Sequence, residues 1–120
     1  MSHYRGGREF EYRTIRHLTT NGYEIVRSAG SKGKIDIVAF KLGELLFVQC
    51  KRTSGTIPPA ERAELVRLAG LVNAVPLVAH QPIPRKPIRY RALTGTGPKQ
   101  WREWTPDHGL QLEGGMQRCR

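Results

Sequence analysis

The first part of the chain has apolar residues at helical spacing. Phe10, Ile15 and Leu18 recur in this pattern, and Asn21-Gly22 then interrupts it. This spacing places the three side chains on one face of a helix, and Asn-Gly is a common stop signal. We therefore predict a helix over residues 7–20.

A second helix is predicted in the middle of the chain, from residue 58 to about residue 73. It begins at Pro58-Pro59, because proline suits the first helical turn. Its apolar side chains recur at i, i+3, i+4 and i+7, so this stripe is expected to face a core. The stripe consists of Leu65, Leu68, Ala69 and Val72.

Short β-branched or alternating segments predict five strands. A turn at Gly43 joins two of them into a hairpin, and the small polar residues 28–34 predict a loop. The strands are expected over residues 23–27, 35–40, 45–51, 75–79 and 88–93. The order α-β-β-β-α-β, with a trailing strand, predicts an α/β fold around a central mixed sheet.

Length and composition narrow the class of protein. The 120 residues fit one domain, which we expect over residues 1–112, with a flexible tail over 113–120. No apolar run approaches the roughly 20 residues that span a bilayer, and no signal-peptide pattern is present, so a cytoplasmic protein is expected. Two cysteines exclude a disulfide framework and a four-cysteine zinc site; Cys50 is expected to be a small core residue and Cys119 a tail thiol.

The charge balance indicates a polyanionic partner. The chain has 20 Lys and Arg against 10 Asp and Glu, a formal net charge of +10. Nucleic acid is the first expectation for such an excess, and an anionic membrane surface is the second. Trp101 and Trp104 lie among basic residues and suit base stacking, but packing is the favoured role for both.

Residues that carry chemistry gather on the predicted hairpin. Asp36 sits in an apolar strand, where an ionised carboxylate is costly to bury without a partner. In the next strand Gln49 and Lys51 share one face, and Cys50 points to the other. Strand pairing can therefore bring a carboxylate, an amide oxygen and an ammonium group onto one sheet surface. The alternative is an exposed hairpin end, with Asp36 in water or in an ordinary salt bridge.

The first predicted helix adds one more carboxylate. Glu11 lies within about 40° of Ile15 and Leu18 on the apolar stripe, whereas Glu9 points toward solvent. An acid on the inner face needs a metal or a lysine nearby; the alternative is a glutamate at the margin of the stripe that reaches water. We expect Glu11 and Asp36 both to face Lys51.

These residues resemble the PD-(D/E)XK nuclease fold, whose signature is a helix glutamate, a Gly-x-x-Asp segment and a strand that ends in x-x-Lys. The nearer resemblance is to archaeal-type Holliday junction resolvases, over roughly residues 4–80. It is carried by Tyr4-Arg5, Gly7, Glu11, Val26-Arg-Ser-Ala-Gly-Ser31, Gly33-Lys-Ile-Asp36, Asp36-Ile-Val-Ala39, Lys51 and the 13-residue gap from Asp36 to Gln49. Two departures are Gln49, where the family usually has Glu, and Tyr12-Arg13, where Arg commonly follows the helix glutamate.

The resemblance implies an endonuclease that uses Mg²⁺, or Mn²⁺ in its place, and cuts two strands of a four-way DNA junction as a homodimer. The metal ligands would be Asp36, Gln49, Glu11 and the backbone carbonyl of Cys50. Lys51 would orient or activate the attacking water, and Ser31 would bind the phosphate or position a water. DNA contacts would come from Arg5, Arg13, Arg27, Lys32, Lys34 and Arg52.

Three alternative functions stay open from the sequence. The first is a restriction or repair nuclease of the same fold that acts on linear duplex DNA. The second is a junction-binding module without activity, because Gln49 supplies no charge to a metal. The third is a basic RNA-binding protein. The dimer interface is expected on the second helix and the later strands. Neither a small-molecule cofactor nor a membrane partner is expected. If the chain is of viral origin, it is expected to act in the host cytoplasm.

Overall fold

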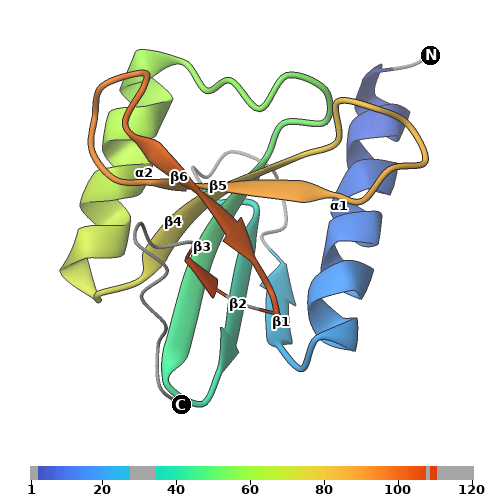
Figure 1. Ribbon diagram of the computed structural model, residues 1–120, viewed down its shortest axis with the longest axis horizontal. Helices are drawn as coiled ribbons and strands as arrows, with labels where there is room; N and C mark the ends of the chain where they lie inside the picture. Colours follow the sequence, from blue (N-terminus) through green and yellow to red (C-terminus); the bar gives the residue numbers. More distant parts are fainter. Residues whose placement is uncertain (1–2, 28–34, 108, 111–120) are drawn as a thin grey trace.

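The computed structural model describes residues 3–27, 35–107 and 109–110, and the side chains of residues 8–27 and 35–107. The elements are α1 (His3–Thr20), β1 (Glu24–Arg27), β2 (Ile37–Lys41), β3 (Glu44–Cys50), α2 (Pro59–Leu71), β4 (Val75–His80), β5 (Arg89–Leu93), β6 (Trp101–Thr105) and β7 (Gly109–Leu110). The seven strands form one sheet in sequence order, and the two helices pack against it (Figure 1). The predicted α/β class is confirmed. None of the helices in the described ranges is long and apolar enough to cross a membrane.

The sheet is mixed, as predicted. Every neighbouring pair of strands is antiparallel except β3 and β4, which are parallel. Helix α2 makes the crossover between these two, as a parallel pair requires. In the β2–β3 hairpin Ile37 pairs with Val48, so Asp36, one residue earlier, lies opposite Gln49. Gly43 closes the hairpin with a φ of 79°, a left-handed conformation that glycine adopts without strain.

The two helices cover opposite faces of the sheet. Phe10 and Leu18 of α1 are buried in one cluster with Leu77 of β4. Leu65 of α2 is buried in a second cluster with Val78, the next residue of β4. Because successive strand residues point to opposite faces, the α1 and α2 clusters lie on the two sides of the sheet. The hairpin end is therefore within reach of side chains from both helices.

The apolar stripe of α2 differs from its prediction. Leu65 and Ala69 are buried as expected, but Val72 lies beyond the end of the helix and is 52% exposed. Arg62 is buried in its place on the inner face, where its guanidinium donates to the backbone carbonyls of Gly95 and Gln100. These carbonyls accept hydrogen bonds from the buried guanidinium of Arg62, so the charged side chain can be buried. A search for apolar residues at helical spacing does not find such a position.

Several boundaries and elements also depart from the predictions. Helix α1 begins at His3 rather than at residue 7, so it includes Gly6-Gly7. Asp36 lies in a bend directly before β2 and not inside the strand. Strands β6 and β7 were not assigned from the sequence: β6 follows a segment rich in Gly and Pro, and β7 has only two residues. The predicted tail, residues 113–120, lies outside the described residues.

Trp101 and Trp104 pack against the core, as favoured from the sequence, but they do so from strand β6. Residues three apart in a strand point to opposite faces. Trp104 is therefore buried in the α1 cluster, with an edge-to-face contact to Tyr90 at 5.1 Å between ring centroids. Trp101 packs at the margin of the α2 cluster, and the Arg91 guanidinium lies 4.2 Å from its ring centroid.

Candidate active site

The candidate site lies at the end of the β2–β3 hairpin, where strand pairing stops. The backbone N–H of Asp36 donates to the carbonyl of Val48 at 2.9 Å. The Asp36 carboxylate in turn accepts a hydrogen bond from the backbone N–H of Cys50 at 2.9 Å. These two bonds fix the carboxylate beside β3, which confirms the predicted meeting of Asp36 and Gln49.

Gln49 brings an unpartnered oxygen to this place. Its side chain is half-buried, and its Oε1 is buried without a hydrogen-bond partner among the described residues. A buried acceptor that is left unpaired costs about 1–3 kcal/mol, so a group of this kind calls for an explanation. A cation or a donor from a bound molecule would satisfy it.

Lys51 follows directly after β3 and is held by an acid that the sequence analysis did not single out. Its Nζ lies 3.1 Å from Oε1 of Glu61, in the first turn of α2. Acidic residues are favoured near helix N-termini, so the position of Glu61 in the first turn of α2 has an ordinary explanation. The sequence alone therefore did not indicate that Glu61 contacts the hairpin. The contact depends on how α2 packs relative to β3, which the local sequence does not specify.

Glu11 confirms the predicted phase of α1 but not its predicted partner. Its side chain is half-buried while Glu9 is exposed. Its Oε1 lies 3.2 Å from Nε of Arg27, at the end of β1, and not beside Lys51. The expected contact of Glu11 with Lys51 is therefore replaced by two other ion pairs, Glu11 with Arg27 and Lys51 with Glu61.

The two carboxylates of the site are electrostatically coupled. Burial is the main cause that raises the pKa of Asp36; Glu61 raises it further, whereas the Cys50 N–H and Lys51 lower it. Burial also raises the pKa of Glu11, and the nearby charge of Asp36 is the second cause. The charge of Asp36 thus acts against ionisation of Glu11, and a cation bound near these carboxylates would favour their ionised forms.

Cys50 is a core residue on its side-chain face, as predicted. Its side chain packs against the α1 cluster, and burial raises the pKa of its thiol well above the usual range. A thiolate nucleophile or ligand is therefore disfavoured. Among the described residues, no three His, Cys, Asp or Glu side chains form a cluster suited to a metal ion. A metal here would need amide or backbone carbonyl oxygens besides the carboxylates.

A buried histidine supports the loop that follows Lys51. His80, at the end of β4, is 5% exposed, and a Cβ added to Gly55 would lie 2.8 Å from its ring. Gly55 also has a φ of 71°, which favours glycine. The loop thus packs closely on His80, and this contact sets where the chain runs between β3 and α2.

The predicted DNA contacts divide into three groups. Arg27 lies beside Glu11, with its guanidinium 5.1 Å from the ring centroid of Tyr12, and Arg52 is exposed next to Lys51. Arg13 lies on another side of α1, where it donates to Gln81. The remaining predicted positions, namely the side chain of Arg5 and residues Ser31, Lys32 and Lys34, lie outside what the structure describes.

Known proteins resemble this chain in sequence and in fold. The family model of the archaeal Holliday junction resolvase (Hjc) matches residues 2–91. The crossover junction endodeoxyribonuclease Hjc of Methanocaldococcus jannaschii is 45% identical over 53 residues, which are 44% of this chain and 39% of that relative. The chain thus matches less than half the length of this curated relative.

A solved structure gives the same result over more of the chain. The structure of Archaeoglobus fulgidus Hjc, a Holliday junction resolvase from an archaeal hyperthermophile, is similar with a TM-score of 0.60 and 25% identity. The similarity covers 76% of this chain and 80% of the other. The predicted nuclease-like α/β core is therefore confirmed.

Proposed function

This chain belongs to the archaeal Holliday junction resolvase (Hjc) family, and from that premise we propose that it is an endonuclease that resolves four-way DNA junctions. The observation that carries the proposal is the cluster at the end of β3. There the Asp36 carboxylate lies opposite Gln49, whose Oε1 has no partner among the described residues, and Lys51 follows directly. A DNA substrate also supports a cytoplasmic place of action.

Mg²⁺ is the proposed metal, with Mn²⁺ as a substitute. The donors available here are oxygens, which Mg²⁺ prefers: the carboxylates of Asp36 and Glu11, the unpartnered Oε1 of Gln49 and the backbone carbonyl of Cys50. A metal held by these oxygens would supply Lewis-acid chemistry, since it would lower the pKa of a water and offset charge on the scissile phosphate. Gln49 provides an oxygen but no charge, so we expect weaker metal binding than a glutamate would give.

The side chains around the metal ligands have separate tasks. Lys51 donates hydrogen bonds to the attacking water or to a phosphate oxygen, and Glu61 keeps its ammonium group in place at 3.1 Å. The Cys50 N–H fixes the orientation of Asp36. Arg27 and Arg52 supply positive charge for the DNA backbone, and Ser31, Lys32 and Lys34 remain predicted contacts for the phosphate or its water.

We further propose that the active form is a homodimer. A four-way junction is cut at two symmetric positions, and a two-fold dimer presents two identical sites. Leu71 and Val72, at the end of α2, are 69% and 52% exposed and suit an interface on this helix. Multi-angle light scattering should give twice the mass of one chain, and a monomer at the concentrations that support cleavage would contradict the dimer.

Cleavage specificity tests the proposed function. The chain is incubated with a labelled four-way junction, a linear duplex with the sequence of its arms, and a matched RNA duplex, in Mg²⁺, in Mn²⁺ and in EDTA. We expect paired nicks in the junction alone and only with metal. Equal cutting of the linear duplex would favour a restriction or repair nuclease. Tight junction binding without cleavage would favour a binding module, and equal competition by RNA would favour an RNA-binding protein.

A further inference from the structure

Glu61 lies on the same side of the sheet as the polar end of β3. Phe47 of β3 packs against the α2 cluster, and Gln49 and Lys51 follow it at two-residue spacing, which places their side chains on that same face. Glu61 is in the first turn of α2, and its Oε1 lies 3.1 Å from Nζ of Lys51. An acid from α2 therefore reaches the face of the sheet that carries Gln49.

The first turn of α2 is fixed by the residue next to Glu61. Arg62 is 5% exposed, and its guanidinium donates to the backbone carbonyls of Gly95 and Gln100. Its own backbone N–H donates to the carbonyl of Pro58 at 2.8 Å, at the start of the helix. The backbone position of Glu61 is thus set by buried contacts of its neighbour, and not by the ion pair alone.

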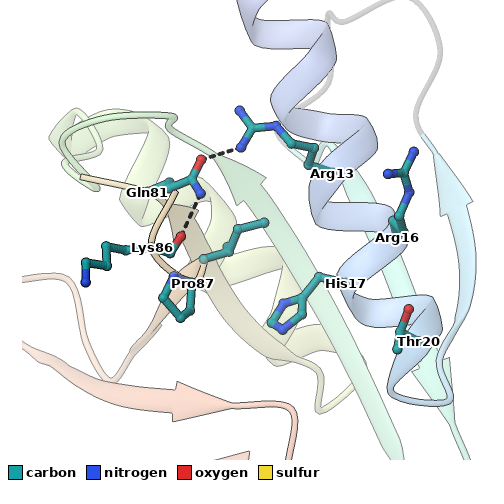
Figure 2. A pocket seen from close by; sticks show the side chains of 8 residues that line it. Arg13, Arg16, His17, Thr20, Gln81, Lys86 and Pro87 are labelled. Atoms are coloured by element: carbon teal, nitrogen blue, oxygen red, sulfur yellow. Dashed lines mark hydrogen bonds between the residues drawn. The ribbon is translucent and has the colours of Figure 1, made fainter. Parts of the chain in front are cut away.

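The chain at Lys51 is held by hydrogen bonds of its own. The backbone N–H of Lys51 donates to the carbonyl of Ala79 at 2.9 Å. The backbone N–H of Gln81 donates to the carbonyl of Arg52, the next residue, at 2.7 Å. The side chain of Gln81 in turn accepts a hydrogen bond from Arg13 of α1 (Figure 2). Both partners of the ion pair are therefore placed by the fold.

The charges that act on one another around Asp36 would cancel without Glu61. The carboxylates are Asp36 itself and Glu11, whose charges are coupled. The cations that act on Asp36 are Lys51 and Arg27, and Arg27 lies 3.2 Å from Glu11. Glu61 also acts on Asp36, so its carboxylate gives this set of ionised side chains one net negative charge.

A divalent cation needs negative charge at its site, and Gln49 does not supply it. Gln49 lies opposite Asp36 and offers only an uncharged oxygen. Mg²⁺ keeps several of its waters in proteins, so a carboxylate can act on it by its charge and through a water, without direct contact. A carboxylate can also accept several hydrogen bonds, so Glu61 can hold Lys51 and accept from such a water.

Glu64 is an acid of the same helix with an ordinary surface role. It lies three residues after Glu61 and is paired with Arg67 at 2.6 Å, not with Lys51. Acids near the N-terminus of a helix interact favourably with its dipole, and partly exposed ion pairs add little to stability. Glu64 therefore serves as a matched control for the removal of one negative charge from α2.

We propose that Glu61 is a positioning residue that sets the charge of the cleavage site: its carboxylate provides from α2 the negative charge that Gln49 does not provide from β3. The inference rests on the proposed function, because it takes the Mg²⁺ of that reaction as the ligand. Glu61 acts through its charge and through Lys51. The loss of Glu61 should then be offset by the substitution Gln49→Glu, which returns a carboxylate to the same face.

Binding of Mn²⁺ to the free protein tests this role, because it is measured without DNA and without turnover. Electron paramagnetic resonance of free Mn²⁺ gives the affinities of wild type, Glu61→Gln, the double variant Gln49→Glu/Glu61→Gln and the control Glu64→Gln. We expect about tenfold weaker binding for Glu61→Gln, and binding within about threefold of wild type for the double variant and the control. The Mg²⁺ concentration for half-maximal junction cleavage should also rise for Glu61→Gln.

Thermal melting in EDTA checks that each variant folds. Wild-type Mn²⁺ affinity in Glu61→Gln would overturn the inference. A loss that Gln49→Glu does not restore would overturn it too, because a displaced lysine or helix would then be responsible, and not a missing charge. If wild type cuts junctions in either of these cases, the inference alone fails. If Mn²⁺ binding depends on Glu61 as expected but wild type cuts no junction, the proposed function fails and the role of Glu61 in metal binding stands.

Discussion

At Asp36, burial in the folded chain disfavours the ionised form of the carboxylate. Burial raises the pKa of its carboxyl above the ordinary value of 3.8, so folding shifts this group toward its protonated form relative to the unfolded chain. The stabilisation from this group is present at low pH and is lost as the pH rises through the raised pKa. At neutral pH, without metal, the ionised carboxylate therefore lowers the stability of the fold.

Asp36→Asn should then stabilise the metal-free protein. Asparagine keeps an oxygen that can accept the Cys50 N–H and removes the charge. In EDTA at about pH 7, calorimetry should show a melting temperature higher by a few degrees than that of wild type. Near pH 3, where both side chains are neutral, the difference should vanish. A lower melting temperature for the variant at pH 7 would contradict this account of Asp36.

Gln49→Glu tests the unpartnered oxygen in the same cluster. An added charge strengthens binding of a hard cation, so half-maximal cleavage should need severalfold less Mg²⁺. In EDTA the same change places a second carboxylate beside Asp36, so the melting temperature should fall. Thr53→Glu, in the exposed loop after Lys51, adds equal charge and serves as the control. A Mg²⁺ requirement that is unchanged, or equal to that of the control, would argue against Gln49 as a ligand.

At the residue scale, the sequence predicted the contacts that depend on local geometry. Asp36 and Gln49 meet because an antiparallel hairpin with a short turn fixes its own register. Glu61 was missed because its contact with Lys51 requires α2 to pack against one particular face of the sheet. Glu11 was placed on the correct side of α1 but given the wrong partner for the same reason.

Among the elements, the loop between β3 and α2 depends on Gly55. Alanine there would meet the His80 ring at 2.8 Å and would also adopt a strained positive φ. Gly55→Ala should therefore lower the melting temperature and, by displacing the loop after Lys51, also slow cleavage. The control is Gly43→Ala, because Gly43 has a similar φ of 79° but open space around its Cβ position. Equal losses of stability in the two variants would show that the contact with His80 is unimportant.

The two acidic residues of helix α1, Glu9 and Glu11, differ in exposure, and this difference can be tested. Glu11→Ala should slow junction cleavage about tenfold or more, since it removes a carboxylate coupled to Asp36. Glu9→Ala should stay within about twofold of wild type, because Glu9 is exposed. Circular dichroism of both variants controls for loss of helix. The reverse order of effects would overturn the assignment of Glu11 to the site.

Helices and strands were predicted correctly where the segment is long or has a clear pattern of apolar and turn residues. The hairpin and both helices were found from periodicity, turn residues and proline. Strand β6 was missed because its tryptophans, three residues apart, serve two different faces of the sheet, so the segment has no single apolar face. Arg62 was missed because its burial depends on carbonyls from a distant turn.

On the scale of the whole molecule, the charged groups of the candidate site gather at the hairpin end. The charges of Lys51, of Glu61 on α2 and of Arg27 on β1 all act on Asp36 there, and Arg27 is paired with Glu11 of α1. The net charge of +10 is thus accompanied by a small, coupled acidic cluster. The sequence predicted both features, but only the fold shows how they lie relative to each other.

Single-turnover cleavage of a labelled four-way junction by wild type and by Asp36→Ala, in Mg²⁺ and with binding measured in parallel, tests the central claim most directly. The account predicts metal-dependent paired nicks by wild type. It predicts that the cleavage rate of the variant is reduced at least about 100-fold, while its junction affinity stays within about threefold of wild type. Cleavage by Asp36→Ala at the wild-type rate would contradict the assignment of the site, and no metal-dependent cleavage by wild type would contradict the function.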